Sequence, residues 1–142
     1  MRILVDTNIV LTYLSGRDDP YSNQCEKIMR MIAENRLQGV IAFHSLSTIW
    51  YVTRKNTEKQ RREYIREICR LLTISGANNE RVRAAVENED FKDFEDALQD
   101  CCALETNCDY IVTANISDYI GKSKTKAVTP DELLRIIRMI KT

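Results

Sequence analysis

The feature that most constrains the fold of this chain is a short segment near its start, Ile3-Leu4-Val5-Asp6-Thr7-Asn8. Three consecutive aliphatic residues indicate a strand that is buried on both faces, as in a parallel sheet. The acid that follows them lies where open α/β sheets bind ligands, beyond the carboxyl ends of the strands. The alternative is that Asp6 is only the N-cap of the next helix and has no chemical role.

Apolar segments of strand length alternate with segments of helical periodicity along the rest of the chain. We expect further strands over residues 40–43, 72–74, 110–113 and 126–128. We expect helices over residues 6–15, 21–35, 46–54 (started by His44-Ser45), 58–72, 80–87 and 93–107, and a last one opened by Thr129-Pro130-Asp131-Glu132. Such alternation predicts a single α/β domain over residues 1–142, a three-layer α/β/α sandwich with a central, mainly parallel sheet of about five strands.

The composition argues against a zinc site and against a membrane or secreted protein. The chain has one histidine, His44, and five cysteines without a Cys-x-x-Cys pair, which argues against a zinc site and favours reduced thiols. No apolar run has the length of a membrane helix, and the N-terminus is a poor signal peptide. We therefore expect a cytoplasmic protein that does not enter a membrane.

The net charge is zero, but the charged residues are unevenly distributed. Residues 87–118 contain ten acids and one lysine, whereas residues 54–70 contain seven Lys or Arg and three Glu. This asymmetry lets an acidic pocket hold cations while a basic face meets a polyanion. Ordinary solvated helix faces are the alternative.

Four motifs together resemble the PIN domain family, which includes the VapC-like toxins of bacterial toxin–antitoxin pairs. They are Leu-Val-Asp-Thr-Asn from Leu4, Asp-Phe-Glu-Asp-Ala from Asp93, Ile-Val-Thr-Ala-Asn-Ile-Ser-Asp-Tyr from Ile111 and Val-Thr-Pro-Asp-Glu-Leu-Leu from Val128. The resemblance implies a parallel sheet with helices on both faces and an acidic cluster that binds Mg²⁺ or Mn²⁺. It also implies metal-dependent endonucleolytic cleavage, usually of RNA, and a cognate antitoxin protein as a partner. We also expect a homodimer.

The chemistry of phosphodiester hydrolysis agrees with this pattern, because it needs an activated water and relief of negative charge at phosphorus. Divalent cations held by carboxylates supply both. Carried over residue by residue, the resemblance assigns catalysis and metal binding to Asp6, Asp96 and Asp118. Asp93 is interpreted as the N-cap of its helix, and contact with a second metal ion is the alternative for it.

Four further residues are expected to support the site without binding the metal directly. The resemblance implies that Thr7, Asn8 and Asn115 orient a carboxylate or a bound water. In the helix after the second strand, most family members carry a Glu where this chain has Thr48. No acid occurs between Glu34 and Glu58, so a shifted alignment does not restore one. Thr48 retains a hydroxyl for a metal-bound water, but the site has three core carboxylates instead of four.

Contact with substrate is assigned to Lys122, Lys124 and Lys126, which follow Asp118, and in second place to the basic residues 54–70. His44 is expected to cap or pack, and the aromatic pair Trp50 and Tyr51 to lie in the core or an interface. Because Thr48 replaces an acid, the rival hypothesis is a PIN-like module that binds RNA or a protein without cutting. A phosphatase of the haloacid dehalogenase type is a weaker alternative, because its second Asp would fall at Asn8.

Overall fold

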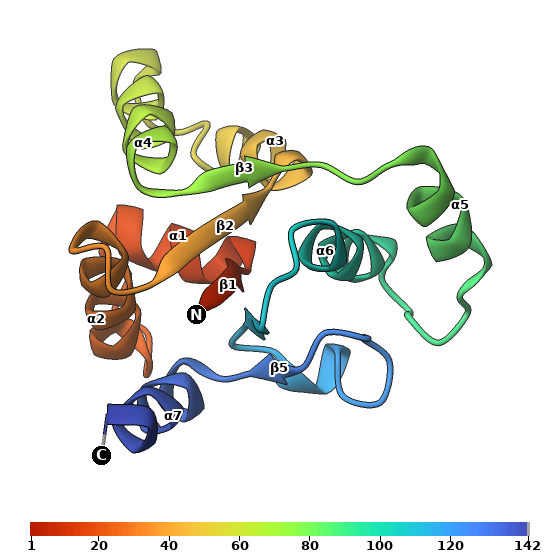
Figure 1. Ribbon diagram of the computed structural model, residues 1–142. Helices are drawn as coiled ribbons and strands as arrows, with labels where there is room; N and C mark the ends of the chain where they lie inside the picture. The colour runs from red at the N-terminus through yellow and green to blue at the C-terminus, as the bar shows by residue number, and fades with distance from the viewer. Residues whose placement is uncertain (142) are drawn as a thin grey trace.

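The computed structural model describes residues 1–141 and contains a five-stranded sheet whose neighbouring strands are all parallel. The strands are β1 (Arg2–Val5), β2 (Gln38–Ala42), β3 (Thr73–Ser75), β4 (Tyr110–Val112) and β5 (Ala127–Val128). Their order across the sheet is β3-β2-β1-β4-β5, so the first strand is central (Figure 1). The predicted parallel α/β sheet of about five strands is confirmed.

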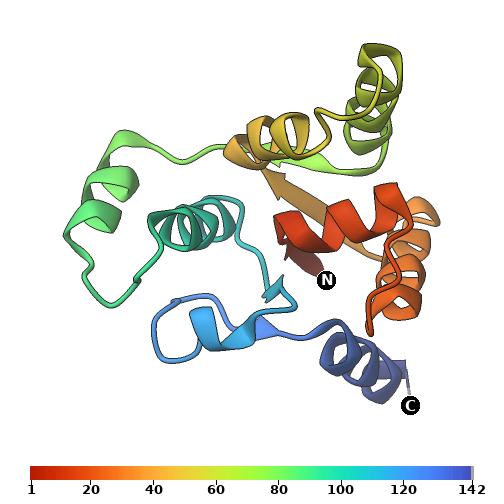
Figure 2. The same cartoon turned by 180° about the vertical axis from the view of Figure 1, so that it is seen from behind.

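Helices cover both faces of this sheet, as predicted. They are α1 (Thr7–Ser15), α2 (Ser22–Ala33), α3 (Phe43–Val52), α4 (Glu58–Leu71), α5 (Asn79–Glu87), α6 (Phe94–Glu105) and α7 (Pro130–Lys141), and a 3₁₀ turn, η1, spans Ile116–Asp118. One layer contains α1, α2 and α7, and the opposite layer contains α6 with α5 outside it (Figures 1 and 2). None of the helices within residues 1–141 combines the length and the apolarity needed to cross a bilayer.

The alternation of side chains along each strand divides the core in two. Ile3 and Val5 of β1 belong to a cluster with apolar residues of α1, α2, α4 and α7. Leu4, between them, belongs to the cluster formed with α5 and α6. Since successive strand residues point to opposite faces, a continuous aliphatic run is what a central strand covered on both sides requires.

One boundary differs from expectation in a way that matters for the site. Phe43, predicted as the last residue of the second strand, is instead the first residue of α3 and is 68% exposed. The strand ends at Ala42, whose register partner is Ser75. Phenylalanine favours strands only when neighbouring strands supply packing, which this position lacks. The helix therefore starts at Phe43, one residue before the predicted start at His44-Ser45.

Candidate active site

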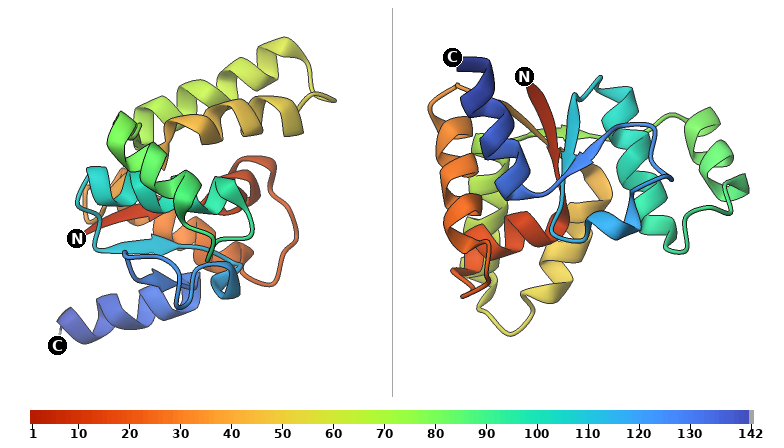
Figure 3. Two further views of the ribbon diagram at one scale, coloured as in Figure 1. Left: turned by 90° about the vertical axis from the view of Figure 1, so that its right-hand side faces the viewer. Right: turned by 90° about the horizontal axis from the view of Figure 1, so that it is seen from below.

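Three separate elements bring Asp6, Asp96 and Asp118 to the edge of the sheet where the strands end. Asp6 directly follows β1, and Asp118 is the last residue of η1, shortly after the neighbouring strand β4. Asp96 is the third residue of α6, which packs across β1, β2 and β4. The right-hand view of Figure 3 places η1 and the starts of α3 and α6 at the end of the sheet opposite to both chain termini.

The Asp6 carboxylate is only 8% exposed and is held by three donors. Its Oδ1 accepts the backbone N–H of Thr7 at 2.8 Å and the amide nitrogen of Gln99 at 3.2 Å. Its Oδ2 accepts the hydroxyl of Thr113 at 2.8 Å. Burial raises the pKa of Asp6, and the carboxylate of Asp118 raises it further, while the bonds from Thr113 and Thr7 oppose these effects. Asp6 is thus both the N-cap of α1 and part of the acidic site.

Asp96 lies close enough to Asp6 for the Asp6 carboxylate to raise its pKa, and it is hydrogen-bonded to Tyr119. The Tyr119 hydroxyl donates to Oδ1 of Asp96 at 3.1 Å, and the Tyr119 ring is fully buried. Burial raises the pKa of Asp96 to about 6, with added contributions from the carboxylates of Asp93, Asp6 and Asp118, whereas the hydrogen bond from Tyr119 lowers it. The same burial and the carboxylates of Asp6 and Asp96 raise the pKa of Tyr119, so its hydroxyl keeps its proton and remains a donor.

Two more acids stand at the start of α6. Asp93 is the N-cap of this helix, since its carboxylate accepts the backbone N–H of Glu95 at 2.9 Å. Glu95 is half-buried, and burial together with the carboxylates of Asp93 and Asp6 raises its pKa. Sequence reasoning did not select Glu95, although it stands inside the Asp-Phe-Glu-Asp-Ala motif.

The chemistry of these donors fits a hard divalent cation, because all of them are carboxylate oxygens. Burial is the main cause of the raised pKa of Asp6 and Asp96, and the neighbouring carboxylates add to it, Asp118 at Asp6 and Asp93, Asp6 and Asp118 at Asp96. Across residues 1–141, however, no group of three or more His, Cys, Asp or Glu side chains is positioned to hold a metal ion as it stands. Binding of one cation by all three aspartates would therefore require their side chains to move closer together.

The residues predicted to support the carboxylates are placed as follows. Thr7 is buried, and its hydroxyl lies 2.7 Å from that of Ser45 on α3. Asn8 is half-buried, and Asn115 is exposed, with its backbone N–H donating to Thr113 Oγ1 at 3.0 Å. The hydroxyl of Thr113 donates to Asp6, and the supporting role of Asn115 stays a prediction.

Thr48 lies on α3 one turn beyond Ser45 and is half-buried. Its hydroxyl donates to the backbone carbonyl of His44 in its own helix at 3.5 Å, a long and weak bond. The side chain by which α3 contacts the Asp6 environment is that of Ser45, which is fully buried. The role of Thr48 as a supporting residue stays a prediction.

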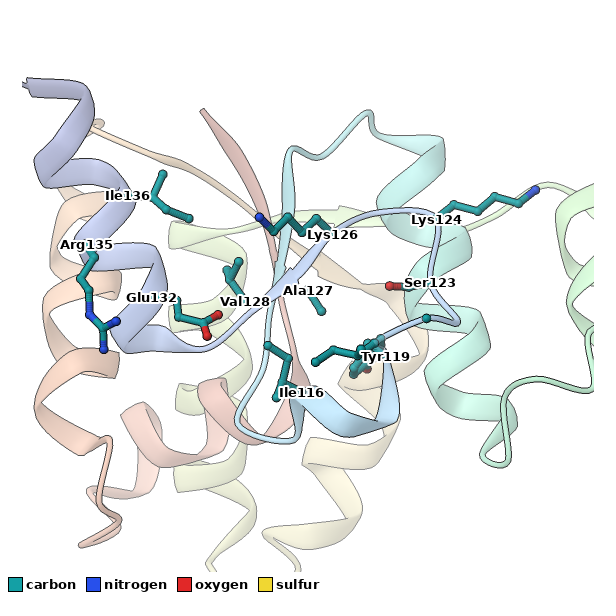
Figure 4. A pocket seen from close by; sticks show the side chains of 12 residues that line it. Ile116, Tyr119, Ser123, Lys124, Lys126, Ala127, Val128, Glu132, Arg135 and Ile136 are labelled. Carbon is teal, nitrogen blue, oxygen red and sulfur yellow. The ribbon is translucent and has the colours of Figure 1, made fainter.

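The loop with Lys122, Lys124 and Lys126 is fixed to α6 by Asp100. The Asp100 carboxylate, which is buried, accepts the backbone N–H groups of Lys124 and Thr125, both at 3.0 Å. In Figure 4 the side chains of Lys124 and Lys126 extend in different directions, and neither points toward Tyr119. Contacts from these two lysines to one substrate would therefore reach separate phosphates.

A surface pocket of about 670 Å³ lies between η1, β5 and α7 (Figure 4). Tyr119 lines it from one side, and Lys124, Lys126 and Arg135 contribute positive charge. The pocket includes none of the three aspartates, so it adjoins the acidic site without containing it.

The positive charge of residues 54–70, the second candidate for contact with substrate, is partly neutralised by acidic residues within the same stretch. On α4, Arg62 pairs with Glu58 at 2.9 Å and Arg70 with Glu67 at 2.7 Å. The guanidinium of Arg61 lies 3.8 Å from the ring centroid of Trp50, which is half-buried. These internal partners leave fewer of the α4 arginines free for phosphates than the charge count suggests.

Two other side chains singled out in the sequence lie near the site elements. Tyr51 is 63% exposed beneath Arg54, so it does not lie in the core, and its place in an interface stays a prediction. His44 stands at the start of α3, and burial lowers its pKa, which favours the neutral imidazole.

A comparison with protein family models matches residues 2–117 to the PIN domain. The chain belongs to the PIN domain family. The resemblance noted in the sequence is thereby confirmed over most of its length, including the segments that carry Asp6 and Asp96. Asp118 lies one residue beyond the matched range, within the same η1 turn.

Known proteins similar to this PIN domain include toxins of the VapC type. Ribonuclease VapC1 of Aquifex aeolicus is 27% identical over 124 residues, covering 83% of this chain and 84% of the relative. The structure of VapBC2 from Rickettsia felis bound to a promoter DNA fragment has a TM-score of 0.67 at 18% identity, over 91% of this chain and 98% of the other. VapBC-1 from nontypeable Haemophilus influenzae gives 0.65 at 16% identity, over 92% and 99%. These structures establish the shared fold.

Three side chains around Asp6 were missed by sequence reasoning, namely Ser45, Gln99 and Thr113. Thr113 could have been found, because β1 and β4 pair through Val5 and Val112 and the next residues on each strand are then neighbours. Gln99 carried a weaker signal, as a polar residue one turn after Asp96 on an otherwise apolar helix face. Ser45 carried none, because serine at the start of a helix is ordinary.

Proposed function

We propose that this PIN domain is a metal-dependent endoribonuclease that hydrolyses RNA phosphodiester bonds and acts as the toxin of a toxin–antitoxin pair. The observation that carries the proposal is the convergence of Asp6, Asp96 and Asp118 from three elements at the carboxyl edge of the sheet. Burial raises the pKa of Asp6 and Asp96, and smaller contributions from the neighbouring carboxylates, in the same direction, support their proximity. The similarity to a named VapC ribonuclease over 83% of the chain supports the same conclusion.

Mg²⁺ or Mn²⁺ held by these aspartates would supply charge neutralisation at the phosphate and an activated water. Asp93 is the N-cap of α6, and contact with a second metal ion is the alternative role for it. The chain itself orients the ligands. Thr113 and Gln99 hold the two oxygens of Asp6, and Tyr119 holds one oxygen of Asp96. Fixing ligand carboxylates by such hydrogen bonds reduces the side-chain freedom that is lost when a cation binds. Lys122, Lys124 and Lys126 would retain the RNA backbone near the site.

The proposal is tested by incubating a structured RNA with the purified full chain in EDTA, Mg²⁺ or Mn²⁺. We expect cleavage only with a divalent ion, and a loss of at least tenfold in Asp96→Asn. Asp131→Asn is a matched control, because it also removes an acid from the first turn of a helix but lies on α7, paired with Arg135. Equal cleavage by the wild-type protein and by Asp96→Asn would exclude the proposed site.

A second candidate function is a PIN domain that binds RNA or a protein without cutting. The observation in its favour is that Thr48 stands where an acid is expected and that no three acids within residues 1–141 are already placed to hold a metal. RNA binding that is retained in EDTA, with no cleavage under any metal, would select this alternative.

An antitoxin protein and a second copy of the chain are the proposed protein partners. Two of the similar structures are described as VapBC proteins, which supports a partner of the antitoxin type. Co-expression with the product of a neighbouring small reading frame, followed by co-purification, tests the first. Light scattering after gel filtration tests the homodimer.

A further inference from the structure

Gln99 is a polar side chain in the innermost part of the structure. It lies on α6 one turn after Asp96, with Ala97, Cys101 and Cys102 buried around it, and its exposed fraction is 0%. Burial of an amide costs free energy unless hydrogen bonds replace those made with water. A glutamine kept in such a place therefore requires partners that explain it.

The amide nitrogen of Gln99 joins three elements at one point. It lies 3.2 Å from Oδ1 of Asp6, 3.2 Å from the hydroxyl of Thr7 on α1 and 3.1 Å from the hydroxyl of Ser45 on α3. The two hydroxyls are 2.7 Å apart, so they also bond to each other. The buried network is neutral apart from the Asp6 carboxylate.

The orientation of the amide follows from its neighbours. With the two amide ends exchanged, the Gln99 oxygen would face a carboxylate oxygen at 3.2 Å, which is repulsive when Asp6 is ionised. In the observed orientation the Gln99 oxygen is buried, and no donor within residues 1–141 lies within hydrogen-bond distance of it. An unpaired buried carbonyl oxygen is costly, and such groups in natural proteins often mark functional sites. The contact with Asp6 therefore accounts for the orientation of the amide, in which the oxygen is left unpaired.

We propose that Gln99 is a positioning residue that fixes Asp6 for cation binding, with Ser45 and Thr7 holding the amide in place. The inference rests on the proposed function and deepens it. No acid of this chain lies on α3, so α3 reaches Asp6 through neutral side chains, Ser45 and then Gln99. Gln99 restrains Oδ1 while Thr113 restrains Oδ2, so both oxygens of the Asp6 carboxylate are held.

A purely structural role makes a different prediction. If Gln99 only links α1, α3 and α6, its replacement lowers stability with and without metal by the same amount. If it positions Asp6, its replacement weakens cation binding in addition. The dissociation constant for Mn²⁺ therefore separates the two roles, whereas the melting temperature alone does not.

The test uses Gln99→Met, which keeps most of the length of the side chain and removes the donor. Its Mn²⁺ dissociation constant, from calorimetry on the full chain, should rise by about tenfold to a hundredfold, the effect usual for groups that orient a metal ligand. Thr113→Val, which frees the other Asp6 oxygen, should act in the same direction. Cys102→Ser, in the same buried helix face but outside the network, is the control and should leave the constant within about twofold of wild type. In an Asp6→Asn background, Gln99→Met should cause no further change.

Ser45→Ala is the second variant, needed if Gln99→Met does not fold, and a smaller rise in the same constant is expected. A wild-type constant in either folded variant overturns the inference, since the wild-type protein then binds Mn²⁺ without help from Gln99. If the wild-type protein itself neither binds Mn²⁺ nor cleaves RNA, the proposed function fails and this inference fails with it. The two failures are distinguished by the behaviour of the wild-type protein.

Discussion

The phenol of Tyr119, a fully buried side chain, donates its hydrogen bond at 3.1 Å to the half-exposed carboxylate of Asp96. The pair connects the turn after β4 with the start of α6, 23 residues earlier. Burial and three neighbouring carboxylates raise the pKa of Asp96, and Tyr119 is the group that opposes them. Burial is the largest of these effects, and the group that partly offsets it is a residue that was not among the predicted site residues.

Removal of this bond should be measurable. In Tyr119→Phe we expect the pKa of Asp96 to rise above its value of about 6, because the bond that favours the charged form is lost. The change is followed by ¹³C NMR titration of the Asp96 carboxyl group in metal-free protein. The substitution keeps the aromatic ring, so packing is preserved and only the hydroxyl is lost. An unchanged or lower pKa would show that the hydroxyl does not stabilise the carboxylate.

Metal binding should stabilise the folded protein. A cation that binds only the folded state adds about 2.7 kcal/mol at a hundredfold excess over its Kd. We expect melting midpoints of the wild-type protein to be higher in Mg²⁺ or Mn²⁺ than in EDTA. Asp96→Asn should raise the midpoint slightly in EDTA, because one repelling charge is gone, and should remove the response to metal. Identical midpoints of the wild-type protein in all three buffers would count heavily against a metal site.

The pH dependence of metal-free stability has a definite sign. The pKa of Asp96 is about 6 in the folded protein against an ordinary 3.8, so the folded state binds this proton more tightly than the unfolded state. Its contribution to stability is complete below 3.8 and is lost as the pH rises through about 6. In EDTA, the advantage of Asp96→Asn over wild type should therefore widen across this interval and level off above it. A gap that narrows as the pH rises would contradict the assigned shift.

The lysines of the loop after η1 are the predicted RNA contacts. Changing Lys122, Lys124 and Lys126 together to Ala should weaken binding similarly for different RNA sequences and lower the salt slope by nearly one unit per lost contact. Asp100 holds the loop through backbone N–H groups, so the substitutions leave its anchorage intact. An unchanged salt slope would transfer the prediction to the basic residues 54–70.

Thr48→Glu tests whether α3 faces the acidic site one turn beyond Ser45. Without metal, a fourth carboxylate should destabilise the protein and raise the pKa of one or more site acids. With metal, the added oxygen ligand should tighten binding, so the difference between metal-free and metal-bound midpoints should widen in a Mn²⁺ titration. An effect of equal size with and without metal would mean that Thr48 does not line the site.

Most of the fold could be predicted from local signals. The aliphatic run of β1 ends in Asp6, and the last helix begins with a capping box in which Thr129 and Glu132 exchange hydrogen bonds of 3.1 Å. Each of these two patterns spans only a few residues, so the local chain geometry is enough to produce it. Phe43 was misassigned because an apolar residue at a strand end does not reveal whether a neighbouring strand continues beside it.

What only the tertiary structure decided is how the Asp6 carboxylate is held. Asp6 could be selected from its place after the first strand, but its donors Gln99 and Thr113 lie 93 and 107 residues further along the chain. Ser45 adds a third segment to the same network. Strand register and the packing of α6 across the sheet bring these groups together. Neither of these features can be recognised from a periodic pattern of residues in the sequence. The sequence determined that Asp6 reaches the carboxyl edge, because the end of a strand is a local feature, whereas the contacts that orient its carboxylate arise only when distant helices pack.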